Sequence, residues 1–189
     1  MEKAYYLGLD QGTTGETALL LDRDMRVVAR GYHEHRQFFP KPGWVEHVPQ
    51  EILDSLLKAA EQAMRNAGVC WEQIRSIGLA NQGETCLMWD RYTGEPVYPA
   101  IVWQDRRTST AADALAQRHR EDIQQRTGLI VDGYFSATKL QWIMDNVPQV
   151  RERIEKGQLL AGTLDSWLIW KLTGGALHVT DCATASRTM

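Results

Sequence analysis

The sequence is poor in cysteine, with only Cys70, Cys86 and Cys182 in a chain of 189 residues. The count is odd, and none of the three belongs to a Cys-x-x-Cys pair. This pattern argues against a disulfide framework and against a zinc site. We therefore expect three buried free thiols in a reducing cytosol.

Long hydrophobic runs are also missing, and none approaches the ~18 residues needed to cross a bilayer. The first six residues lack the apolar core of a signal peptide. We expect a soluble, cytoplasmic protein with no membrane contact. Basic residues are not in excess, since 21 of them stand against 24 acidic ones, a net charge of −3. A nucleic-acid partner is not expected, because it usually requires a basic face.

Metal-ligand spacing is not seen among the five histidines. His33 and His35 would point to one face of a strand, where we expect them to be exposed to solvent. The sequence shows no internal repeat and no low-complexity segment. With 43% hydrophobic and 24% charged residues, its composition is that of an ordinary globular protein.

The apolar pattern predicts strands at the start of the chain and helices towards its end. Residues 5–9, 17–21 and 25–32 are typical of an antiparallel meander of three strands. Helical spacing begins at Pro49 and stops at Gly68. The further strands expected are 74–80, 86–90, 97–103 and 159–160, and the further helices are 108–118, 121–126, 137–146, 149–156 and 164–172. This order predicts an α/β fold with a mixed sheet flanked by helices.

The turn between the first two strands, residues 10–15, reads Asp-Gln-Gly-Thr-Thr-Gly. It is neither a Walker loop nor a Gly-x-Gly-x-x-Gly motif, because no Gly-Lys-Ser/Thr ends it and no helix follows. Its glycines would let the backbone approach a phosphate, and its threonines add hydroxyl donors. The same residues also suit an ordinary hairpin turn, and their spacing alone does not separate the two interpretations.

Residues 7–14 closely resemble the first phosphate-binding hairpin of the FGGY carbohydrate kinases, which share the fold of actin, hexokinase and the Hsp70 ATPase. Further matches stay in register along the whole chain and point to the glycerol kinase branch of that family. They comprise residues 40–47, 81–85, 100–107, 127–129, 134–139, 162–170, 180–181 and 185–189.

The resemblance implies a ribonuclease H-like fold and transfer of the γ-phosphoryl group of ATP to a polyol hydroxyl, with glycerol as the expected acceptor. Gly12, Thr13 and Thr14 would bind the phosphates, and Asp10 would hold Mg²⁺ through water. The family's general base is an aspartate downstream of this chain, so no catalytic residue is expected within it. Residues 1–189 would then be an incomplete N-terminal kinase domain, inactive alone and part of a homo-oligomer at full length.

The resemblance also implies a polyol pocket lined by Gln82, Gly83, Glu84, Trp103 and Tyr134. A carboxylate can accept hydrogen bonds from two neighbouring hydroxyls, and a tyrosine hydroxyl can pair with a third. An indole face packs on a carbon skeleton and excludes water. Judged singly, the two aromatic residues could equally be core residues, and the glutamate a solvated carboxylate.

Two departures from the family pattern leave the substrate open. Gly83 stands where glycerol kinases carry an arginine that donates to glycerol hydroxyls. Its loss would cost roughly 1.5–3 kcal/mol, or about tenfold to a hundredfold in binding. Gly15-Glu16-Thr17 replaces the usual Ser-Ser-Arg, so Glu16 would repel the phosphates if it faces them. Three hypotheses follow: a glycerol-type kinase, a kinase for another polyol or ketose, and a non-catalytic sensor.

Overall fold

The computed structural model describes residues 4–189, which divide into two compact units. The first unit comprises the chain up to Gln37 together with Val48–Gln82. The second comprises Phe38–His47 and Gly83–Met189. The chain thus passes three times from one unit to the other, and the expected pocket residue Gln82 ends the first unit just before Gly83 begins the second.

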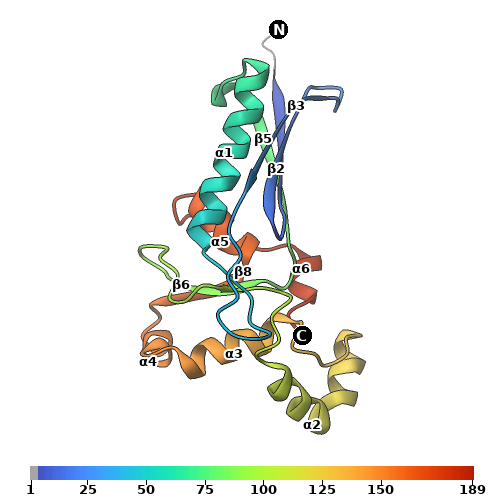
Figure 1. Ribbon diagram of the computed structural model, residues 1–189, viewed down its shortest axis with the longest axis vertical. Coiled ribbons are helices and arrows are strands. Elements are labelled where there is room, and N and C mark those ends of the chain that lie inside the picture. The colour runs from blue at the N-terminus through green and yellow to red at the C-terminus, as the bar shows by residue number, and fades with distance from the viewer. Residues whose placement is uncertain (1–3) are drawn as a thin grey trace. The chain divides into compact units, whose positions relative to one another are not determined.

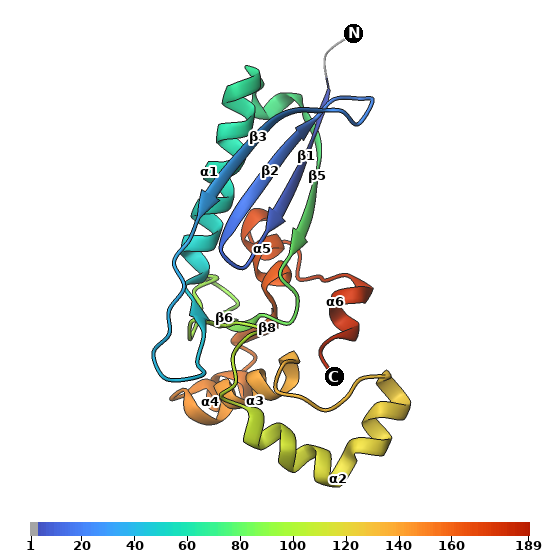
Figure 2. The ribbon, with the colours of Figure 1, turned by 45° about the vertical axis from the view of Figure 1, so that its right-hand side comes forward.

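A four-stranded mixed sheet forms the first unit (Figure 2). Strands β1 (Tyr5–Gln11), β2 (Gly15–Leu21) and β3 (Val27–Glu34) are antiparallel neighbours, as predicted. Strand β5 (Ile74–Asn81) follows the 3₁₀ turn η1 (Trp71–Gln73) and pairs with β1 in parallel, which gives the order β3-β2-β1-β5. A parallel neighbour requires a crossover connection, and a helix supplies it here.

Helix α1 (Pro49–Ala67) is that crossover, and it lies along one face of the sheet (Figure 1). The apolar side chains at helical spacing are buried, and the helix ends at Gly68 with φ 64°, both as predicted. The helix approaches β3 so closely that a Cβ at Gly31 would lie 1.9 Å from the carbonyl oxygen of Ala59. Only glycine fits at that contact.

The second unit has its own four-stranded sheet, which is antiparallel throughout. Its order is β4 (Glu46–His47), β7 (Ala100–Ile101), β6 (Cys86–Asp90) and β8 (Leu159–Thr163). Strand β7 is shorter than the predicted 97–103, and β8 is longer than 159–160. Strand β4 is not among the predicted strands, because two residues carry no readable alternation.

The helices of the second unit are α2 (Ser109–Thr127), α3 (Ser136–Asn146), α4 (Val150–Glu155), α5 (Leu164–Leu172) and α6 (Cys182–Ser186). The prediction of two helices over 108–126 is wrong, because α2 runs without a break to Gly128. The polar residues His119 and Arg120 interrupt the apolar pattern, but they do not break a helix. The α/β class with flanking helices is confirmed. The strands are divided between two separate sheets.

All three cysteines are free, as expected, but only Cys86 is buried. The prediction of burial is wrong for Cys70 and Cys182, which precede η1 and begin α6. Within residues 4–189, no group of three metal-ligating side chains comes together. In that same range no helix combines the length and the apolar character that a bilayer crossing demands.

Candidate active site

The β1–β2 hairpin forms a tight turn at the expected phosphate-binding residues. The N–H of Gly12 donates to the carbonyl of Gly15 at 3.0 Å. A Cβ at Gly12 would lie 2.8 Å from that same oxygen, so a side chain cannot enter without moving the turn. Thr13 is half-buried and Thr14 is exposed, and the Thr14 carbonyl accepts a long bond from the His35 N–H at 3.4 Å. This closed glycine turn suits the close approach of an anion.

Asp10 lies near the end of β1 with an exposed side chain, opposite Thr17 on β2. An exposed carboxylate is the kind of oxygen donor that Mg²⁺ prefers, directly or through water. The Arg30 guanidinium, from β3, donates to the Thr17 hydroxyl at 3.4 Å. Thr17 occupies the position where the FGGY kinase pattern has an arginine. The Arg30 guanidinium from β3 lies beside it.

Glu16 follows this turn, but its carboxylate is buried and faces His35. The carboxylate lies 2.9 Å from the His35 Nδ1, and the two side chains are 0% and 1% exposed. Burial raises the pKa of Glu16, and the hydrogen bond and charge of His35 act against that rise. The expectation that His35 is exposed is therefore wrong. A glutamate engaged in this way is a weaker source of repulsion than one lying free at the turn.

Glu84 is the central residue of a three-residue turn in the second unit. The Thr85 N–H donates to the Gly83 carbonyl at 2.7 Å, and Glu84 has φ 58°, a conformation uncommon outside glycine. The Glu84 carbonyl accepts from the Ser136 hydroxyl at 3.1 Å and from the Lys139 ammonium at 3.4 Å. Strained backbone held by several contacts is common at functional sites.

Trp103 and Tyr134 lie together, with ring centroids 5.8 Å apart and planes at 68°. Both side chains are partly exposed, so neither is an ordinary core residue. Burial raises the pKa of Tyr134, and the negative charge of Glu84 raises it further. The phenol, the indole and the buried Glu84 carboxylate therefore form one cluster in the second unit. We call these three residues the carboxylate–aromatic cluster.

Two residues beside this cluster were missed by the sequence analysis. Lys139 is completely buried, and its ammonium donates to the backbone carbonyls of both Glu84 and Tyr134. Arg187 donates through Nε to the Glu84 carboxylate at 2.7 Å. Both lie within segments that match the family, but their shared partner Glu84 is 55 and 103 positions away, and no local pattern reveals such pairs.

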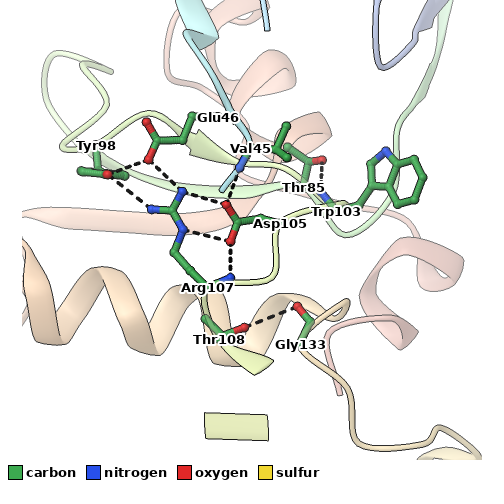
Figure 3. A network of polar contacts seen from close by, with 9 residues as sticks. All are labelled: Val45, Glu46, Thr85, Tyr98, Trp103, Asp105, Arg107, Thr108 and Gly133. Atoms are coloured by element: carbon green, nitrogen blue, oxygen red, sulfur yellow. Dashed lines mark hydrogen bonds and ion pairs between the residues drawn. The ribbon is translucent and has the colours of Figure 1, made fainter. Parts of the chain in front are cut away.

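The loop that carries Trp103 is fixed by a buried network (Figure 3). Arg107 forms bidentate bonds with Asp105 and also pairs with Glu46 at 2.8 Å. The Asp105 carboxylate accepts the Val45 N–H at 2.6 Å, which ties in the segment Phe38–His47. The Arg107 guanidinium also lies over the Trp44 ring at 3.8 Å. Residues of the expected Pro-Lys-Pro-Gly-Trp motif thus support the loop of Trp103.

Gln82 and Gly83 are consecutive residues that belong to different units. Gln82 belongs to the first unit, where its N–H donates to the Gln11 carbonyl at 2.8 Å, and its side chain is buried. Gly83 is partly exposed, and a Cβ built there meets no heavy atom within 4 Å. The backbone at position 83 therefore has room for the first atom of a side chain.

Comparison with known proteins gives one consistent result. Residues 5–189 match the model of the FGGY family of carbohydrate kinases, N-terminal domain. The chain is 51% identical over 188 residues to the glycerol kinase of Deinococcus radiodurans, and 53% identical over 186 residues to glycerol kinase 2 of Thermotoga maritima. These alignments cover 100% and 98% of this chain but 38% of each relative, so the chain spans well under half of their length.

Solved structures agree with the sequence relatives. A glycerol kinase from Plasmodium falciparum, crystallised with ADP, superposes with a TM-score of 0.90 at 34% identity. A xylulose kinase from Brucella ovis superposes with a TM-score of 0.84 at 28% identity. The two matches cover 98% and 97% of this chain and 37% of each solved chain. They confirm the fold that the sequence predicts.

Proposed function

Because the chain belongs to the FGGY family of carbohydrate kinases, we propose that it is the N-terminal part of an ATP-dependent polyol kinase that phosphorylates glycerol. The observation that carries this proposal is the carboxylate–aromatic cluster of Glu84, Trp103 and Tyr134. One buried carboxylate with a phenol and an indole face beside it offers acceptors for hydroxyls and an apolar surface for carbon. That is the chemistry of a small polyol.

The phosphate-binding residues would be Gly12, Thr13 and Thr14, with Asp10 holding Mg²⁺ through water. The closed glycine turn and the exposed carboxylate at the end of β1 support this assignment. The bound ion would neutralise phosphate charge, since phosphoryl transfer depends mainly on positioning and electrostatic stabilisation. The general base would be an aspartate outside residues 1–189. The full-length protein would be a cytoplasmic homo-oligomer.

A kinase for a larger polyol or a ketose is the second candidate, and the open space at Gly83 favours it. A glycine there offers no donor to glycerol and leaves room for further carbons. The non-catalytic alternative rested partly on repulsion by Glu16, whose carboxylate is buried against His35. We therefore rank it below the two kinase candidates.

The deciding experiment measures kcat/KM of the full-length protein with ATP and Mg²⁺ over glycerol, four- and five-carbon polyols, and ketoses. Glycerol as the best acceptor supports the first candidate, and a larger acceptor supports the second. No turnover with any of them contradicts both. The matched variants Gly83→Arg and Gly78→Arg then test the pocket, because both positions are open. Only Gly83→Arg should favour glycerol over the larger acceptors, by about tenfold or more.

A further inference from the structure

Arg187 is placed beside the carboxylate–aromatic cluster by the short helix α6 and by the start of α3. The Asp181 side chain caps α6 by accepting the Thr184 N–H at 2.9 Å, and the Arg187 N–H bonds back to Thr184. The following Thr188 carbonyl accepts the Ala137 N–H at 3.0 Å, which joins this end of the chain to the first turn of α3. The position of Arg187 is therefore set by backbone bonds on both sides.

The guanidinium lies close to three residues of the second unit. Its Nε donates to Glu84 at 2.7 Å, and its central carbon lies 5.8 Å from the Tyr134 ring centroid and 5.1 Å from that of Phe135. The Arg187 side chain is 43% exposed, whereas that of Glu84 is 7% exposed. The carboxylate is thus reached by a cation whose outer part remains open to a ligand.

The donor inventory shows what this arrangement offers. A guanidinium carries five N–H donors in a rigid fork. The bond to Glu84 engages the donor on Nε, and a hydrogen bond with the Tyr134 hydroxyl engages another. A carboxylate and a guanidinium side by side present acceptors and donors at a spacing that suits neighbouring hydroxyls. Gly83, just before Glu84, contributes no donor and leaves its own space open.

We propose that Arg187 contacts the substrate and determines specificity: its guanidinium donates to a polyol hydroxyl next to the one that Glu84 binds. It supplies from α6 the donor that Gly83 does not offer. The preferred ligands are acyclic polyols with adjacent hydroxyls, and compounds that lack the contacted hydroxyl are disfavoured. The inference rests on the proposed function, because it assumes that the carboxylate–aromatic cluster binds the acceptor.

The test compares Arg187→Gln with wild type in the full-length protein on glycerol, propane-1,2-diol and propane-1,3-diol. Each diol keeps a primary hydroxyl that can be phosphorylated but lacks one hydroxyl of glycerol. We expect the variant to raise the KM for glycerol by about tenfold to a hundredfold, with the KM for ATP within about twofold. For the diol that lacks the contacted hydroxyl, the same variant should change the KM little. Arg151→Gln, which removes an exposed arginine that pairs with Asp145, is the matched control and should change neither constant.

The outcomes separate the two proposals. If the wild-type protein phosphorylates no polyol, the proposed function fails and the inference fails with it. If the wild type is active and Arg187→Gln leaves the KM for glycerol unchanged, only the inference is overturned. An equal loss with glycerol and with both diols also overturns it, because Arg187 would then act only by holding Glu84. Partial rescue by Arg187→Lys, limited to substrates with the contacted hydroxyl, would support a direct contact.

Discussion

The Glu16 carboxylate and the His35 Nδ1 lie 2.9 Å apart, and both side chains are almost completely buried. The pair joins the first residues of β2 to the segment after β3, beside the turn that we assign to phosphate binding. His35 also donates its N–H to Thr14 in that turn. The two contacts of His35 therefore join the Glu16 carboxylate to the turn of the hairpin.

Replacing Glu16 by glutamine should remove a pH dependence of hairpin stability. Burial raises the pKa of Glu16, so the folded state holds its proton more tightly than the unfolded chain does. Protonated Glu16 therefore contributes to the free energy of unfolding. This contribution is complete below about pH 4.5, the ordinary pKa, and is lost as the pH rises through the pKa of the folded state. Hydrogen exchange over residues 12–17, corrected for the intrinsic rate, should show this decline in wild type and not in Glu16→Gln.

Glu51→Gln is the matched control for that experiment. The hydrogen bond from Arg36 lowers the pKa of Glu51, so its contribution is lost only as the pH falls below about 4.5 towards the folded value. In Glu51→Gln the protection of residues 12–17 should therefore still decline as the pH rises above about 4.5, as in wild type. An unchanged pH profile in Glu16→Gln would contradict the role given to the buried pair.

Gly12→Ala should weaken nucleotide binding. The added Cβ would lie 2.8 Å from the Gly15 carbonyl oxygen, so the turn must shift. Overpacking of this size costs about 1–3 kcal/mol, which corresponds to roughly fivefold to a hundredfold in binding if the turn must bear that cost to hold the nucleotide. Calorimetric titration of the full-length protein with ADP and Mg²⁺ would measure it. Gly78→Ala on β5 adds the same methyl group into open space and should leave the affinity within about twofold.

Lys139→Met should damage the polyol site more than the nucleotide site. The ammonium donates to the Glu84 and Tyr134 carbonyls, and the loss of a hydrogen bond from a charged donor costs about 1.5–3 kcal/mol. The Glu84 carbonyl keeps its bond from the Ser136 hydroxyl. We expect a higher KM for the acceptor, with a KM for ATP near that of wild type, in steady-state kinetics. Lys156→Met, which removes an exposed lysine that pairs with Glu152, should change neither constant. Equal effects on both KM values would refute a local role for Lys139.

Arg107→Met should destabilise the second unit strongly. It would leave the Asp105 and Glu46 carboxylates without their shared cation and remove the guanidinium from the Trp44 ring. Breaking a buried ion pair costs about 3–5 kcal/mol. Hydrogen exchange over residues 42–47 and 102–107 would measure the local loss.

The control for that loss is Arg126→Met, which breaks an exposed pair with Asp122 on α2. An exposed helical pair is worth about 0.3–0.5 kcal/mol. A comparably small effect of Arg107→Met would show that the network is not a main support of the Trp103 loop.

Local patterns predicted the parts of the fold that depend on neighbouring residues. Alternation gave the β1–β2–β3 meander, and helical spacing between Pro49 and Gly68 gave α1. The same reasoning wrongly predicted two helices where α2 is one. A change in the apolar pattern does not interrupt the backbone hydrogen bonds of a helix. This reasoning missed β4 and α6, of two and five residues, because such short elements form through partners that lie elsewhere in the chain.

The candidate site shows the same division. The resemblance to the family predicted Glu84, Trp103 and Tyr134 as pocket residues. Each of them lies in a segment that matches a family motif. Their grouping in one unit, the strained turn at Glu84 and the burial of Glu16 against His35 were not. Those features depend on which side chains face each other after folding.

The sequence by itself determined the family and predicted the turn that we propose to bind phosphate and the residues expected in the pocket, because these depend on residue type and spacing along the chain. Only the tertiary structure decided what surrounds them. It brought Arg187 to Glu84 across 103 positions and gave Lys139 hydrogen bonds to the Glu84 and Tyr134 carbonyls. The physical reason is that a buried charge takes whatever partner the packing brings to it, and packing joins positions that no sequence interval relates.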